Sequence, residues 1–162
     1  MNEPQEGLEP PQRPGPSELT EEAGLEALRG HVVQKALEAR RRHGPGFDRE
    51  SLGRMLADAE IVRFETELRF DAAPLQRGEF GWAEPRGDDP REGFVLVLHP
   101  ALEERSELLP LAVAYHVPSI NYLDVATRHE AELFGAALLG LGVEEYYRKV
   151  CAMADELCPA PA

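Results

Sequence analysis

The chain has 162 residues, of which 43% are hydrophobic, and its 30 acidic and 17 basic side chains give a formal net charge of −13. This length and hydrophobic content suit one domain that builds its core without disulfides or metals. The negative charge argues against nucleic-acid and membrane-surface partners, and the lack of an apolar leader or a long apolar run predicts a cytoplasmic protein.

The N-terminal part is expected to hold a disordered tail followed by two helices. Residues 1–19 are rich in proline and charge and contain too few apolar side chains to offset the entropy lost on ordering. Apolar residues then recur every three or four positions from Thr20 to His43, which predicts an amphipathic helix with Thr20 as its N-cap. A short second helix is expected to follow Asp48.

Three strands are expected in the middle of the chain. Apolar and charged residues alternate through residues 61–70, which predicts a strand with one buried and one solvated face. A second strand is predicted at 79–83, with Phe80 and Trp82 on one side. Residues 94–98 contain no polar position, which is typical of a central strand covered on both faces. The simplest arrangement is a meander with helices packed against it.

Three helices are expected in the C-terminal part. Pro110 can begin a helix that Pro118 ends, although this apolar run could also form a strand. Thr127 and Glu130 have the spacing of a capping box, which predicts the start of a further helix. Residues 143–157 form the last predicted helix.

Together these elements predict a single α+β domain over residues 20–158, with a short C-terminal tail at 159–162. Its sheet is expected to be small and mainly antiparallel, with about three strands, and to pack with about five helices. The last helix has an apolar seam that suits either the core or a homodimer interface, with four residues as the candidate contacts: Val143, Tyr147, Val150 and Ala154. Cys151 and Cys158 are too far apart on that helix for a disulfide and are expected to stay reduced.

Histidines and carboxylates gather in the second half of the chain: His99, His116, Asn121, Asp124, His129 and Glu132. Two or three imidazoles with a carboxylate suit zinc or non-haem iron, and an Asp beside a His suits acid–base chemistry. The candidate ligands of a divalent metal are therefore His99, His116, Asp124 and His129. No spacing matches a known metal motif, so a structural interpretation stays open, with His116 bonded to backbone and His129 on the surface.

No phosphate-binding loop or nucleophile elbow is present. The leading hypothesis is a small acidic, non-catalytic protein-interaction module without a cofactor, such as an adaptor, regulator or chaperone, that binds a protein partner and self-associates. The alternative is a metal-dependent enzyme or metal-binding protein that uses the histidines and aspartate within residues 99–132. A third hypothesis is a small-molecule pocket lined by Trp82, Tyr115 and Tyr122.

Overall fold

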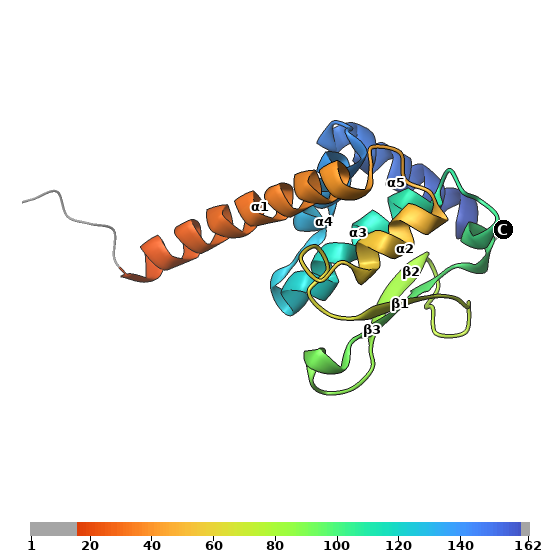
Figure 1. Ribbon diagram of the computed structural model, residues 1–162, viewed down its shortest axis with the longest axis horizontal. Helices are drawn as coiled ribbons and strands as arrows, with labels where there is room; N and C mark the ends of the chain where they lie inside the picture. Colours follow the sequence, from red (N-terminus) through yellow and green to blue (C-terminus); the bar gives the residue numbers. More distant parts are fainter. Residues whose placement is uncertain (1–15, 160–162) are drawn as a thin grey trace, which may run out of the picture.

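The computed structural model describes residues 16–159, and these residues form an α+β fold of five α-helices and one three-stranded sheet (Figure 1). The elements follow in the order α1 (Pro16–His43), α2 (Arg49–Ala57), β1 (Thr66–Phe70), β2 (Gly81–Pro85), β3 (Phe94–Leu98), α3 (Leu109–Tyr122), α4 (Arg128–Leu139) and α5 (Val143–Leu157). The predicted fold class is confirmed. Most of the tail predicted at 1–19, and residues 160–162, lie outside the described residues.

The sheet is mixed, with β3 between β1 and β2. β3 pairs parallel to β1, with Thr66 opposite Phe94, and antiparallel to β2, with Trp82 opposite Val97. The central position of β3 is confirmed, but the expected meander is wrong. After β1 the chain leaves the central position of the sheet open and forms β2 at the far edge. It then returns as β3, which fills the position between β1 and β2. A strand as apolar as β3 is best buried with a neighbour on each side.

The helices lie on one face of the sheet, where α2 and α3 cover the strands (Figure 1). Three side chains of β3 join the hydrophobic core on this face: Phe94, Leu96 and Leu98. Val95 and Val97 alternate to the opposite face. There the strand register places Arg69 and Trp82 on either side of Val97. The core therefore begins between the sheet and the helices α2 and α3, and it continues among the helices, where α4 packs on α3 and α1 packs on α4.

α3 is the most buried helix, and it is longer than predicted. It continues through Pro118 to Tyr122, so the predicted end at Pro118 is wrong. A proline inside a helix removes one backbone hydrogen bond and costs about 3 kcal/mol. Ile120 and Asn121, in the turn after Pro118, are both buried. Full burial of the Ile120 side chain contributes about 1.5–3 kcal/mol, which is similar in size to this loss.

The segment before β1 is a bent turn, so the strand predicted at 61–70 begins only at Thr66. Ile61 and Val62 are consecutive and both buried, which breaks the alternation seen in the strand. The amide of Asn121 holds this turn: its Nδ2 donates to the Ile61 carbonyl oxygen (2.8 Å), and its Oδ1 accepts from the Arg63 N–H (2.7 Å). A polar side chain from α3 thus replaces strand pairing here.

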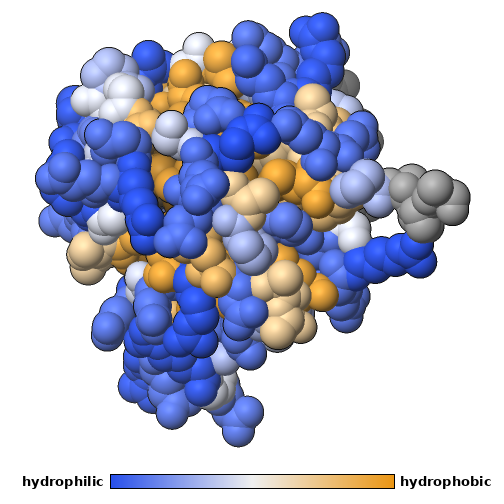
Figure 2. Space-filling view, turned by 90° about the vertical axis from the view of Figure 1, so that its right-hand side faces the viewer, coloured by the Kyte–Doolittle hydropathy of each residue, from blue (hydrophilic) through white to orange (hydrophobic). Residues whose placement is uncertain are grey.

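α1 begins at Pro16, four residues before the predicted Thr20. Proline suits the first helical position because no intrahelical partner exists there for an N–H. Val32, Ala36 and Ala39 are fully buried in the half that packs on α4. The other half projects from the body (Figure 1), with exposed side chains over residues 21–27. On the face turned away from this projection, apolar residues show in small patches between polar ones (Figure 2).

The remaining helix starts follow the sequence closely. Asp48 caps α2 by accepting from the Ser51 N–H (2.8 Å), and Thr127 with Glu130 forms the expected capping box of α4. α5 has the predicted bounds. In the described part of the chain, none of the helices combines the length and hydrophobicity that crossing a membrane requires.

Candidate functional site: a groove beside the free edge of β2

The four candidate metal ligands lie in three different places. His116 and Asp124 line one groove, His99 lines a separate pocket, and His129 is exposed at the start of α4. Within residues 16–159, no three His, Cys, Asp or Glu side chains are placed to hold one metal ion. The described residues therefore do not join the four candidates into a single coordination sphere.

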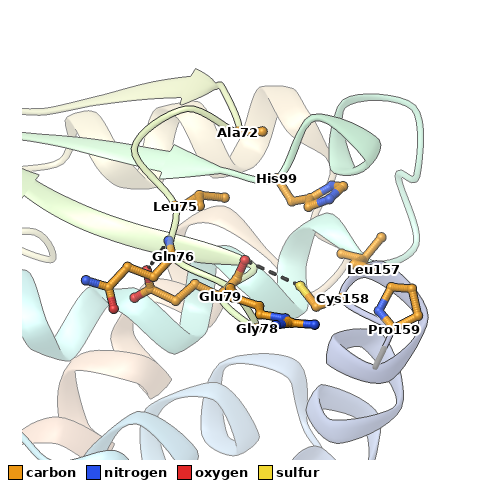
Figure 3. Close-up of a pocket in the computed structure, with 10 residues that line it drawn as sticks. Ala72, Leu75, Gln76, Gly78, Glu79, His99, Leu157, Cys158 and Pro159 are labelled. Atoms are coloured by element: carbon orange, nitrogen blue, oxygen red, sulfur yellow. Dashed lines mark hydrogen bonds between the residues drawn. The ribbon is translucent and has the colours of Figure 1, made fainter. Parts of the chain in front are cut away.

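His99 has a local structural contact. Its Nδ1 accepts from the Ala101 N–H (3.1 Å) and so caps the short 3-10 helix Pro100–Glu103. The ring lines a pocket of about 370 Å³ at the end of α5 (Figure 3). In this pocket the Cys158 thiol donates to the Glu79 carbonyl oxygen (3.4 Å), the bond that Figure 3 marks between α5 and the segment before β2. Burial raises the pKa of Cys158, which keeps it a thiol.

The other residues of the predicted cluster also have structural contacts. Asn121 holds the turn before β1, as described above. Glu132 pairs with Arg128 on the same helix (Oε1–Nε 3.5 Å). The side chains of Asn121 and Glu132 are thus both bonded to other residues of the fold.

His116 lies at the floor of the groove, on the side of α3 that faces β2. Its Nδ1 must donate to the Ala112 carbonyl oxygen (2.7 Å), because a carbonyl only accepts. The ring packs edge-on against Phe80 (centroids 5.4 Å apart) and Tyr115 (5.5 Å). Burial lowers the pKa of His116, so the imidazole is neutral at pH 7. A Cβ at Gly81 would lie 2.7 Å from His116 Cε1, so only glycine fits there.

The groove has a volume of about 780 Å³, within the range of ligand-binding clefts. Trp82, which is 40% exposed, and Tyr115 contribute aromatic surface to its lining. The charged side chains that line it are all acidic: Glu79, Asp88 and Asp124. With no Lys or Arg among the lining residues, the groove is electrically negative and suits a cationic ligand.

The free edge of β2 opens into this groove. The His99 N–H donates to the Phe80 carbonyl (2.8 Å), and the Arg86 N–H donates to the Gly93 carbonyl (3.0 Å). In an antiparallel ladder, every second residue of a strand is hydrogen-bonded to the neighbouring strand. Between Phe80 and Arg86, the residues bonded to β3 are therefore Trp82 and Glu84. The N–H groups of Gly81 and Ala83 therefore point away from β3. In the described chain, neither of these two N–H groups has a hydrogen-bond acceptor.

The sequence hypothesis of an aromatic pocket is met in part. Trp82 and Tyr115 line the groove together, whereas Tyr122 lies in another pocket, beside His31 and Arg63. The unpaired edge of β2 was not foreseen, because it depends on the strand order. The one local signal for it is Pro85, since proline within a sheet is confined to edges and strand ends.

The predicted interface residues of α5 divide between surface and core. Val143 and Tyr147 are 37% and 41% exposed, whereas Val150 is 6% exposed and belongs to the core. Ala154 is partly buried. The buried stripe of this helix consists of Tyr146, Val150, Met153 and Leu157. Any partner of α5 would therefore contact Val143 and Tyr147.

In comparisons with protein-family models, curated proteins and solved structures, the chain matched none. The groove combines three features: the aromatic surface of Trp82 and Tyr115, an acidic rim formed by Glu79, Asp88 and Asp124, and the free edge of β2.

Proposed function

We propose that this protein is a cytoplasmic, non-catalytic interaction module that binds an extended segment of a partner protein along the free edge of β2. The observation that carries this proposal is the pair of N–H groups at Gly81 and Ala83, which open into a groove and lack acceptors within residues 16–159. An exposed strand edge is a template for another strand, and many domains bind peptides in this way. Two free cysteines, Cys151 and Cys158, suit the reducing cytoplasm.

The lining of the groove defines the chemistry of the bound segment. Backbone pairing supplies affinity with little regard to sequence, so the side-chain contacts must supply the specificity. Asp88 and Asp124 favour a Lys or Arg, and the aromatic surface of Trp82 and Tyr115 favours a cation placed over a ring. The partner segment is therefore extended and basic. Its positive charge also suits a chain with a net charge of −13.

The test uses a fluorescein-labelled peptide of alternating Lys and Val, measured by fluorescence anisotropy. Ala83→Pro removes one outward N–H but leaves the bonds between β2 and β3 in place, and proline is tolerated on edge strands. We expect this variant to bind about tenfold more weakly, the effect of about 1.4 kcal/mol, which is within the range for one hydrogen bond. The matched control is Ala83→Ser, which keeps the N–H and should bind like the unchanged protein.

Three results would count against edge pairing. Equal affinity of Ala83→Pro and the unchanged protein would show that the N–H is not used. Equal weakening by Ala83→Ser would show that the site senses side-chain size instead. Binding of an alternating Glu and Val peptide with the same affinity would contradict the role of the acidic rim.

A second candidate activity is self-association through α5. The observation that favours it is the exposure of Val143 and Tyr147, which lie one helical turn apart on the same face. Apolar side chains at this spacing suit helix pairing between two copies.

A further inference from the structure

A second pocket, separate from the groove, collects basic side chains. It has a volume of about 320 Å³ and lies between α1, the turn before β1 and the end of α3. Its lining consists of His31, Lys35, Ala59, Glu60, Arg63, Asn121 and Tyr122. Three of these seven side chains are basic, in a chain whose net charge is −13. The one acidic member, Glu60, pairs with Arg42, which also pairs with Glu38 and Asp58.

Two of the three basic side chains of this pocket are attached to the fold by a polar contact. The Lys35 ammonium donates to the Glu60 carbonyl oxygen, and His31 Nδ1 lies 2.5 Å from the Tyr122 hydroxyl. The Arg63 guanidinium lies over the Phe64 ring, 4.9 Å from its centroid, and the Arg63 N–H donates to the buried Asn121. Side chains anchored in this way lose less freedom when they bind a ligand, which strengthens binding.

In the part of the chain that the structure describes, the cations of the pocket have no anionic partner of their own. Among the described residues, no carboxylate lies within 4.0 Å of the Lys35 ammonium or the Arg63 guanidinium. Burial raises the pKa of Tyr122 to about 12, so its hydroxyl keeps its proton at pH 7. Within residues 16–159, the pocket thus contains two cations without a direct carboxylate partner, together with an imidazole and a protonated hydroxyl.

We propose that this pocket binds a phosphoryl group, as a small phosphate monoester. Two cations balance the charge of a phosphate dianion, and Arg, Lys and hydroxyl groups are its usual donors. A volume of about 320 Å³ exceeds what the phosphoryl group fills and leaves room for a small organic part. The inference is independent of peptide binding at β2, because the two sites share no lining residue.

Thermal unfolding and calorimetry with ribose 5-phosphate test this site. We expect ribose 5-phosphate to raise the unfolding temperature in a saturable way, because a ligand that binds only the native state stabilises it. Ribose alone should leave the unfolding temperature unchanged. If inorganic phosphate binds as tightly as ribose 5-phosphate, the site still takes a phosphoryl group and its source is the free ion. An equal rise in sodium chloride of matched ionic strength would overturn the proposal.

Two double variants with the same change in net charge test whether the ligand binds in this pocket. Lys35→Gln combined with Arg63→Gln should abolish binding, whereas Arg41→Gln combined with Lys149→Gln, outside the pocket, should leave it unchanged. Equal losses of binding in the two double variants would overturn the proposed site. If the first variant fails to fold, Tyr122→Phe removes a single hydroxyl and should weaken binding about tenfold or more, tenfold being the lower end of the range for a hydrogen bond to a charged group. Unchanged affinity in Tyr122→Phe would then contradict the proposal.

Discussion

At the scale of single residues, the packing of α4 on α5 depends on the absence of one side chain. A Cβ built on Gly135 would lie 1.9 Å from Cζ of Tyr146. That tyrosine is fully buried, and its hydroxyl donates to the Leu111 carbonyl oxygen (2.8 Å). Burial raises the pKa of Tyr146 well above its usual range, so it stays a donor. The Tyr146 ring cannot move away from a Cβ at position 135 without losing its hydrogen bond to the Leu111 carbonyl oxygen.

Gly135→Ala is therefore expected to destabilise the protein by about 2 kcal/mol, since overfilled cores lose about 1–3 kcal/mol. The loss should occur although alanine is the better helix former by about 1 kcal/mol. Urea unfolding measures it. Gly53→Ala on α2 is the matched control, because no atom lies within 4 Å of the added Cβ, and it should stabilise the protein. A gain in both variants would contradict the described contact with Tyr146.

At the scale of elements, the start of α4 depends on a buried carboxylate. Glu130 is 1% exposed, and it accepts from the Thr127 N–H (2.8 Å) and hydroxyl. Burial opposes the charged form of Glu130, but these bonds outweigh it and hold its pKa below the usual 4.5. A depressed pKa gives stability that is present above the unfolded value and lost as the pH falls through the folded one.

Glu130→Gln should therefore cost about 1 kcal/mol at pH 7, the usual value of a helix cap. The difference from the unchanged protein should shrink when urea unfolding is repeated at pH 3. Glu104→Gln is the control, because Glu104 is exposed, and it should change stability at neither pH. A difference that stays the same at both pH values would show that the charge of Glu130 does not matter.

Elements with local causes could be predicted from the sequence, and those with distant causes could not. The starts of α2 and α4 follow from Asp48 and from Thr127 with Glu130, whose contacts span only three residues. The turn at 61–65 depends on Asn121, far along the chain, and alternation alone gave no sign of it. The open edge of β2 depends on β1 pairing with β3, which no local pattern specifies. Of the candidate site, the sequence therefore predicted only Trp82, Tyr115, His116 and Asp124.

At the scale of the whole molecule, the net charge of −13 opposes any contact between two copies. An apolar contact through Val143 and Tyr147 would have to overcome this repulsion, which added salt screens. Light scattering at about 50 μM protein should therefore show more dimer in 0.5 M than in 0.02 M sodium chloride.

Tyr147→Glu should remain monomeric under both conditions, since it places a further negative charge in the contact. Leu37→Glu is the matched control, because Leu37 is also exposed but lies on α1, and its dimer fraction should match that of the unchanged protein. A monomer in high salt, or equal effects of the two substitutions, would rule out this surface.

The packing of α1 on α4 has a consequence for synthesis. Val32, Ala36 and Ala39 leave the ribosome early, yet the helix that covers them is among the last segments to be translated. At about 5–20 residues per second, this apolar stripe stays uncovered for several seconds of elongation. Until α4 emerges, these apolar side chains are open to non-native contacts, as transiently exposed apolar surface is during folding.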